Sequence, residues 1–171
     1  MDLRPTSDRL RETLFDVLTA GNPERLIETV WLDVYAGTGA VGIEALSRGA
    51  RMVYFVDNSR GASDLIRQNL TSLQIASESF EVISQDATTA LRRLDAQAIV
   101  SDFCFLDPPY RKTDEYENTL GFLSQSRLLK PDSIVIAEHD KKFALADRFG
   151  SLARYRKLEQ GDAALSFFRL S

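Results

Sequence analysis

Short apolar segments alternate with amphipathic segments along most of this chain. Five apolar runs predict buried strands, at Thr29–Tyr35, Met52–Val56, Phe80–Ile83, Phe103–Leu106 and Ser133–Ala137. Between these runs, apolar residues recur at helical spacing. They predict helices at Ala40–Arg48, Ser59–Leu73, Ala87–Leu94 and Asp114–Ser126.

The two ends of the chain complete this pattern. A first helix is predicted to begin at Thr6 or Ser7, which can act as N-cap, and to end at the sequence Gly21-Asn22-Pro23. We also expect two short helices, at Glu24–Glu28 and Lys142–Phe149. The last two apolar segments predict an antiparallel hairpin around Gly161, and they are Ala153–Leu158 and Ala163–Leu170.

Strands that alternate with helices indicate a parallel sheet with right-handed crossovers. The strands are continuous apolar runs, which is typical when helices cover both faces of a sheet. The closing hairpin adds an antiparallel edge. The sequence therefore predicts an α/β fold with a doubly wound, mostly parallel sheet, in a single domain over residues 1–171.

Composition excludes several classes of protein. The chain has one cysteine and one histidine, which excludes a disulfide framework, a cysteine-rich zinc site and a multi-histidine metal centre. We expect no metal. No apolar run approaches the length of a membrane span, and we expect a cytoplasmic protein with no membrane contact.

Charge is unevenly distributed. The net charge is -4, which speaks against a generally basic, nucleic-acid-binding surface. The segment from Lys141 to Lys157, however, carries six basic residues and one acidic residue. It forms either a local basic face or an ordinary solvated surface.

A glycine-rich loop follows the first predicted strand. Residues 37–42 match the pattern GxGxxG, and Asp57 ends the second strand twenty residues after Gly37. These features fit NAD(H) and S-adenosylmethionine equally well. Asp33, near the end of the first strand, favours a ligand with cationic groups such as S-adenosylmethionine. Asp33 can also serve the loop alone by accepting its backbone N–H groups.

Asp86 and Ala87 follow the third predicted strand. The carboxylate of Asp86 can accept the exocyclic amino group of an adenine. It can equally cap the helix that follows, because Asp is a favoured N-cap residue. The two roles do not exclude each other.

The fourth predicted strand runs directly into Asp107-Pro108-Pro109-Tyr110. Two prolines make this loop rigid, and it stands at the carboxyl end of a strand, where ligands bind in open α/β sheets. Asp107 and the Pro108 carbonyl can accept the N–H groups of an aromatic amine, while Tyr110 stacks on its ring. This arrangement is suited to methylating an exocyclic amine.

The glycine loop and the Asp-Pro-Pro-Tyr loop together resemble class I S-adenosylmethionine-dependent amino methyltransferases. The chain is more specifically similar to the bacterial 16S ribosomal RNA guanine-N2 methyltransferases, through four segments, which are Arg4–Phe15, Leu32–Ala50, Leu65–Leu70 and Phe105–Tyr110. The resemblance implies a seven-stranded Rossmann-like methyltransferase sheet. It also implies methylation of the N2 amine of a guanine in small-subunit ribosomal RNA.

The resemblance assigns roles residue by residue. The implied catalytic residues are Asp107, Pro108, Pro109 and Tyr110. The implied cofactor-binding residues are Asp33, Ala36, Gly37, Gly39, Asp57, Asn58, Asp86 and Ala87. The implied RNA-binding residues are Arg4, Arg9, Arg11 and Arg111.

The resemblance also implies partners. We expect ribosomal RNA, within an assembling small subunit, and a monomeric enzyme. The family has a basic N-terminal extension before its Arg-Pro-Thr motif, and we expect that extension to be absent because only Met1-Asp2-Leu3 precede Arg4. Alternative substrates are a DNA base, a protein glutamine or a small amine. A cofactor-binding module without turnover is a further alternative.

Overall fold

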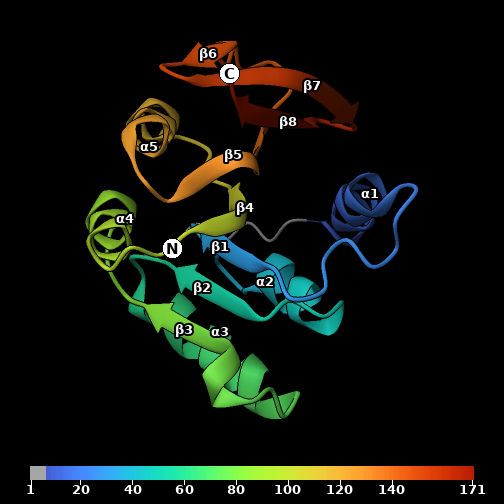
Figure 1. The fold of residues 1–171 in the computed structure, drawn as a ribbon, viewed down its shortest axis with the longest axis vertical. Coiled ribbons are helices and arrows are strands. Elements are labelled where there is room, and N and C mark those ends of the chain that lie inside the picture. Colours follow the sequence, from blue (N-terminus) through green and yellow to red (C-terminus); the bar gives the residue numbers. More distant parts are fainter. Residues whose placement is uncertain (1–6) are drawn as a thin grey trace.

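A computed structural model describes residues 7–171, in which eight strands form one sheet with the order β3-β2-β1-β4-β5-β8-β7-β6 (Figure 1). The strands are β1 Val30–Val34, β2 Met52–Val56, β3 Phe80–Ile83, β4 Ser101–Leu106, β5 Leu129–Asp140, β6 Arg148–Phe149, β7 Leu152–Gln160 and β8 Ala163–Leu170. The helices are α1 Asp8–Thr19, α2 Ala40–Ser47, α3 Arg60–Ser72, α4 Ala87–Ala96 and α5 Asp114–Gln125, with a 3₁₀ turn at Ser77–Ser79.

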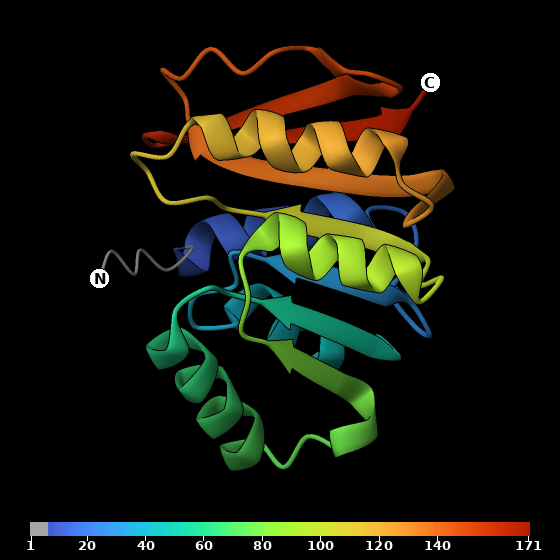
Figure 2. The ribbon, with the colours of Figure 1, turned by 90° about the vertical axis from the view of Figure 1, so that its left-hand side faces the viewer.

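Strand direction divides the sheet into two parts. Strands β3, β2, β1, β4 and β5 run parallel, whereas β8, β7 and β6 are joined to β5 by successive antiparallel pairings. The predicted doubly wound sheet with an antiparallel edge is therefore confirmed. In Figure 2 the carboxyl ends of the parallel strands lie together at one edge of the sheet, and this edge carries the loops predicted to form the site.

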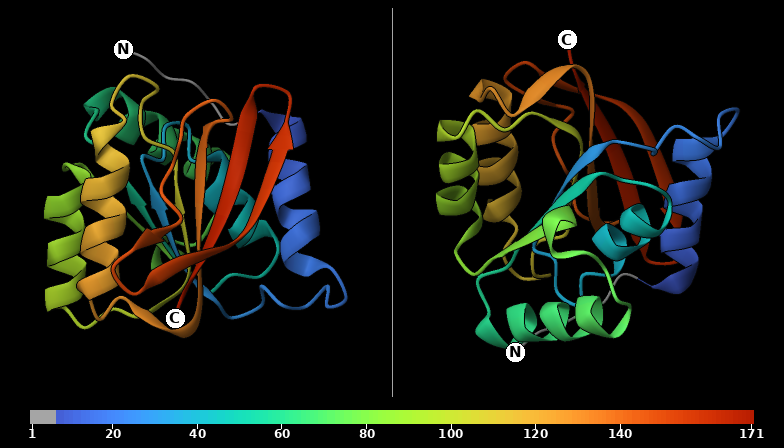
Figure 3. Two further views of the ribbon diagram at one scale, coloured as in Figure 1. Left: turned by 90° about the horizontal axis from the view of Figure 1, so that it is seen from above. Right: turned by 60° about the horizontal axis from the view of Figure 1, so that its bottom comes forward.

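Helices cover both faces of the sheet, as Figure 3 shows with α1 on one side and α4 and α5 on the other. Helices α1, α2 and α3 bury one apolar cluster that includes Trp31 and Phe103, while α4 and α5 bury the other, which includes Leu32 and Cys104. Because successive strand residues point to opposite faces, neighbouring residues of β1 belong to different clusters. Burial of apolar surface on both faces stabilises the parallel strands.

Trp31 lies at the centre of the first cluster. Its ring stacks between Phe15 of α1 and Phe103 of β4, with centroid distances of 5.6 and 4.7 Å. The N-cap of α1 is Ser7, whose hydroxyl accepts a hydrogen bond from the Leu10 backbone N–H at 3.1 Å. This cap positions the helix start beside the carboxyl edge of the sheet.

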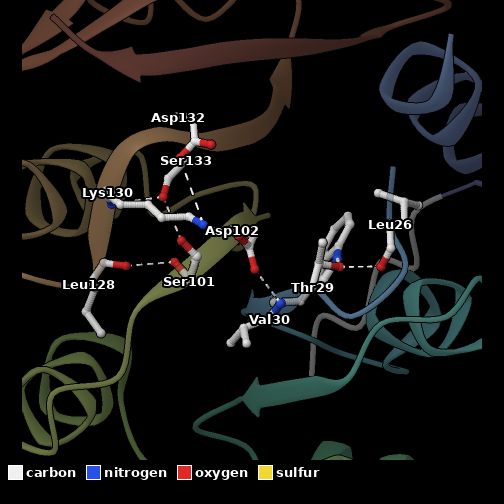
Figure 4. Close-up of polar contacts among 10 residues, drawn as sticks. Leu26, Thr29, Val30, Ser101, Asp102, Leu128, Lys130, Asp132 and Ser133 are labelled. Atoms are coloured by element: carbon white, nitrogen blue, oxygen red, sulfur yellow. Dashed lines mark hydrogen bonds and ion pairs between the residues drawn. The ribbon is translucent and has the colours of Figure 1, made fainter. Parts of the chain in front are cut away.

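The opposite, amino-terminal edge of the sheet is joined by polar contacts (Figure 4). The Asp102 carboxylate accepts the Val30 N–H at 2.8 Å and pairs with the Lys130 ammonium at 2.7 Å. The Ser133 hydroxyl donates to the Ser101 carbonyl at 2.6 Å. These contacts connect β1, β4 and β5 at the end of the sheet remote from the predicted site.

Two expected helices are wrong. Residues 24–28 form hydrogen-bonded turns, since Glu28 has a positive φ of 65° and its N–H donates to the Gly49 carbonyl at 2.8 Å. Residues 142–149 form turns and the short strand β6, because Phe143 and Phe149 pack into the α4–α5 cluster instead of continuing a helix. Strand β6 also makes the sheet eight-stranded, where seven strands were expected.

None of the helices in residues 7–171 combines the length and the apolar character that crossing a membrane requires.

Candidate active site

A cavity of about 380 Å³ opens at the carboxyl edge of the parallel strands. Four loops meet there, one after each of β1, β2, β3 and β4. This is the position at which open α/β sheets bind ligands, because the chain diverges to opposite faces on either side of β1. Nine of the predicted site residues line it: Gly37, Asp57, Asn58, Asp86, Ala87, Asp107, Pro108, Pro109 and Tyr110.

The glycine loop has a defined backbone conformation. Gly39, the N-cap residue of α2, has a φ of +80°, and a Cβ there would lie 3.3 Å from the Phe55 side chain. The side-chain amide of Asn69 in α3 donates to the Thr38 carbonyl at 3.1 Å. The Ala36 N–H donates to the Val56 carbonyl at 3.0 Å. Contacts from β2 and α3 therefore hold the loop against the sheet.

Asp33 lies beneath this loop and outside the cavity wall that the described residues form. Its carboxyl is buried, with 1% of its surface exposed, and it accepts the Gly42 N–H at 3.0 Å. The pKa of Asp33 is raised to about 8, mainly by burial; the Gly42 hydrogen bond opposes this rise, and the nearby Asp57 adds a smaller part of it. The loop-capping contact is thus present. Ala36 and Gly39, like Asp33, are not among the described residues that line the cavity.

Asp57 reaches the cavity from the end of β2. One carboxylate oxygen accepts the Gly37 N–H at 2.9 Å, and the other accepts the Ser59 N–H at 2.8 Å. Each oxygen keeps a further lone pair for a ligand. Asp57 therefore joins the glycine loop to the start of α3 and presents an oriented carboxylate to the cavity.

The loop after β3 contributes two polar side chains. Asp86 caps α4 by accepting the Thr89 N–H at 3.2 Å, and hydrogen bonds from Thr89 and Thr88 lower its pKa. Asp86 also lines the cavity, so its position permits both roles. The neighbouring Gln85 was missed in the sequence; its amide oxygen is buried and has no hydrogen-bond donor among the described residues.

The Asp-Pro-Pro-Tyr loop forms the opposite wall. The Asp107 N–H donates to the Val34 carbonyl at 3.3 Å, which ties the loop to β1, and the Pro109 carbonyl accepts the Lys112 N–H at 2.9 Å. Pro108 is buried, whereas Tyr110 is 53% exposed. The prolines and these two hydrogen bonds fix Asp107 in the wall while leaving the Tyr110 ring accessible.

Tyr110 stands between two hollows. Besides the first cavity, it borders a second cleft of about 500 Å³, formed by the start of α1, the end of β5 and the β7–β8 turn. The Tyr110 hydroxyl donates to the Asp140 carboxylate at the end of β5. Arg9 lines the second cleft. A ligand in the second cleft can therefore reach the Tyr110 ring from the side that faces away from the first cavity.

The predicted RNA-binding arginines have different surroundings. Arg9 and Arg111 are exposed at the site edge. Arg11 is partly buried and pairs with Asp8 at 3.2 Å and with Glu44 at 3.7 Å, so part of its charge is compensated within the protein. Arg4 lies outside the described residues. Of the three that the structure describes, Arg9 and Arg111 are the ones best placed to meet a partner.

Glu115 and Lys112 also line the cavity, although the sequence did not single them out. The Tyr35 hydroxyl donates to Glu115 at 2.8 Å and lies 2.8 Å from the Thr119 hydroxyl. Burial raises the pKa of Tyr35, so this group stays a neutral donor. These contacts join the glycine loop to α5, and no local sequence signal reveals them because the partners are 80 or more residues apart.

Comparison with known proteins places this arrangement in a family. The family described as Conserved hypothetical protein 95 matches residues 1–169. This chain belongs to that family. Ribosomal RNA small subunit methyltransferase D of Haemophilus influenzae is 35% identical over 81% of this chain and 69% of its own length. The protein of the same name from Escherichia coli K12 is 28% identical, over 98% and 79%.

Solved structures agree with this membership. The candidate methyltransferase yhhF of Escherichia coli has a TM-score of 0.82 and 27% identity, covering 98% of this chain and 88% of its own. The candidate methyltransferase SMU.776, complexed with S-adenosylhomocysteine, shares the fold with a TM-score of 0.73 and 12% identity, over 95% and 48%. The names of these relatives agree with the expected methyltransferase class, for which the sequence predicts S-adenosylmethionine as the cofactor.

The cavity fits this cofactor by its own chemistry. Its wall carries four carboxylates, Asp57, Asp86, Asp107 and Glu115, against one basic residue, Lys112, which suits a ligand with cationic groups. The buried, unpartnered amide oxygen of Gln85 is an acceptor for an amino group such as that of adenine. When bound, the cofactor supplies an electrophilic methyl group attached to a sulfonium.

Proposed function

We propose that this chain methylates the exocyclic N2 amine of a guanine in small-subunit ribosomal RNA. The observation that carries the proposal is the position of the Asp-Pro-Pro-Tyr loop, which forms one wall of the cofactor cavity and presents Tyr110 to a second cleft. The names of the Haemophilus influenzae and Escherichia coli relatives support a ribosomal RNA substrate.

Asp107 is the residue that would act on the nucleophile. The nitrogen of an exocyclic amine is a poor nucleophile, because its lone pair is delocalised into the base. A carboxylate and a carbonyl that accept the two N–H groups would localise this lone pair on the nitrogen and direct it toward the methyl donor. Asp107 and the Pro108 carbonyl provide such acceptors on a rigid loop, so little reorganisation is needed during the reaction.

Tyr110 would hold the base. Its exposed ring offers a stacking surface, and the hydrogen bond from its hydroxyl to Asp140 limits rotation of the side chain. Stacking of a base on an aromatic ring contributes about 1–3 kcal/mol. A guanine that is paired within a helix cannot reach this ring, so the target nucleotide must be unpaired or flipped out.

The charges around the site also suit a nucleotide. The cavity wall is acidic, while exposed basic residues stand at its edge, on the loops after β4 and β5 and at the start of α1; they are Arg9, Arg111, Lys112, Lys141 and Lys142. Phosphates would be attracted to this rim and repelled from the interior. The neutral base is then the part of the nucleotide that can enter.

The test compares Asp107→Ala with Asp114→Ala, which makes the same change at an exposed position in the first turn of α5. Transfer of a labelled methyl group to unmodified 16S ribosomal RNA is measured, and the product nucleoside is identified by mass spectrometry. We expect Asp107→Ala to lower kcat about a hundredfold or more while the cofactor dissociation constant changes little.

Asp114→Ala should keep normal turnover. Wild-type turnover by Asp107→Ala would refute the role of Asp107. A methylated nucleoside other than N2-methylguanosine would refute the proposed acceptor atom.

A further inference from the structure

The basic charge of this protein gathers at one end of the sheet. Residues 141–171 contain seven basic and three acidic residues, a net charge of +4, whereas residues 1–140 contain 14 basic and 22 acidic residues, a net charge of -8. The positive segment includes β6, β7 and β8, which lie together at the top of Figure 1. A protein that is acidic overall therefore has one end suited to a polyanion.

An exposed aromatic ring lies within this basic end. The pairing of β7 with β8 is irregular between Arg154 and Arg156, and Tyr155, at this irregularity, is 44% exposed. The guanidinium of Arg169 lies over the Tyr155 ring, 4.1 Å from its centroid. The Phe167 ring supports Tyr155 at a centroid distance of 6.2 Å. We name Tyr155, Arg156 and Arg169 the β7 platform.

The other basic residues nearby have partners in the protein. Arg154 is bound to Asp147 and to the Ser166 hydroxyl, and its side chain is only 15% exposed. Lys157 faces Glu159 at 3.7 Å. Arg156 is exposed and makes no ion pair with the residues that the structure describes. Its charge is therefore available to an external anion.

The outer edge of β7 is also open. Strand β6 pairs only with Leu152 and Ala153, so beyond Arg154 no described strand pairs with the outer edge of β7, the edge opposite β8. Exposed cations on an edge strand can serve simply to prevent association of edges, and this would account for Arg156. Protection of the edge does not account for the exposed Tyr155, whose ring is covered by the guanidinium of Arg169 from β8.

We propose that the β7 platform binds an unpaired segment of the substrate RNA outside the methylated nucleotide. A base would stack on Tyr155 beside the plane of Arg169, and a neighbouring phosphate would pair with Arg156. This inference rests on the proposed function, since it assumes an RNA substrate. It adds a second point of attachment that would set the orientation of the RNA without contacting the reacting base.

The experiment measures binding of whole 16S ribosomal RNA, and of a short fragment around the methylated guanine, at two salt concentrations. The variants are Tyr155→Ala and Arg156→Glu, and Arg92→Glu, on the exposed face of α4, is the matched control. We expect Tyr155→Ala and Arg156→Glu each to weaken binding of the whole RNA about tenfold. Arg156→Glu should also lower the salt slope by about 0.7–0.9, as expected for one lost phosphate contact.

Binding of the short fragment and of S-adenosylmethionine should stay unchanged. If Tyr155→Ala and Arg156→Glu bind the whole RNA as tightly as Arg92→Glu does, the inference is overturned and the proposed function stays intact. Failure of the wild-type protein to methylate the RNA, both free and within small ribosomal subunits, would refute the proposed function itself. A change in sedimentation without a change in RNA affinity would also overturn the inference, because the occupant of the edge would then be a second copy of the chain.

Discussion

Asp33 provides a sharp test of how the glycine loop is held. The buried carboxyl accepts the Gly42 N–H, and burial raises its pKa from 3.8 to about 8. The folded protein therefore keeps Asp33 protonated over a pH range in which the unfolded chain ionises it. Asp33→Asn preserves an oxygen acceptor for the Gly42 N–H and removes the titration.

The sign of the effect follows from proton linkage. Between about pH 4 and pH 8 the folded state binds more protons at Asp33 than the unfolded state does, so the wild-type free energy of unfolding falls as pH rises. The stabilising contribution of the protonated Asp33 to the free energy of unfolding is fully present below about pH 4. It is lost as the pH rises through about 8. Each pH unit in this range lowers the free energy of unfolding by about 1.4 kcal/mol, so the loss between pH 5 and pH 8 is about 4 kcal/mol.

Urea denaturation of the wild-type protein and of Asp33→Asn at pH 5, 6, 7 and 8 measures this loss. The difference between the two free energies of unfolding should widen with pH in favour of Asp33→Asn. Asp16→Asn, at an exposed position on α1, should follow the wild-type curve. A difference that stays constant from pH 5 to pH 8 would show that Asp33 is ionised in the folded protein.

The same variant separates the two roles that the sequence left open for Asp33. If Asp33 only caps the loop, Asp33→Asn should bind S-adenosylmethionine with nearly unchanged affinity in calorimetry. A loss of affinity greater than tenfold, without unfolding, would show that its carboxylate pairs with a cationic group of the cofactor. The position of Asp33 outside the cavity wall leads us to expect the first result.

Three further outcomes are expected. Asp57→Ala should weaken S-adenosylmethionine binding by about 1–3 kcal/mol in calorimetry, and NADH should not bind the wild-type protein; unchanged cofactor affinity would contradict the cofactor-binding role of Asp57. Gly42→Ala should lower the free energy of unfolding by about 1–3 kcal/mol in urea, because its Cβ would lie 2.4 Å from Phe55. Burial lowers the pKa of His139 below 6.5, so its contribution to stability is present above pH 6.5 and is lost as pH falls. His139→Gln should reduce the acid sensitivity of the melting temperature below pH 6.5, and an unchanged pH profile would contradict this assignment.

Local sequence patterns determined most of the architecture. The apolar runs predicted all five parallel strands, because strands buried on both faces must be continuously apolar. Capping chemistry predicted that α1 begins at Thr6 or Ser7, and Ser7 is the N-cap; this contact is local, between residues three apart. The predicted site loops converge because the carboxyl ends of parallel strands lie at one edge of the sheet. Asp57, Asp86 and Asp107 each follow such a strand and therefore reach the same cavity.

Tertiary structure decided what depends on contacts between distant segments. Residues 24–28 have helical composition, yet a hydrogen bond to Gly49 holds Glu28 in a left-handed conformation. Gln85 and Glu115 join the cavity wall only because β3 and α5 are packed against β2 and β4. The protonation of Asp33 depends on how completely α2 and the sheet exclude water from it. Burial and long-range partners are properties of the assembled fold, and a local pattern of residues cannot specify them.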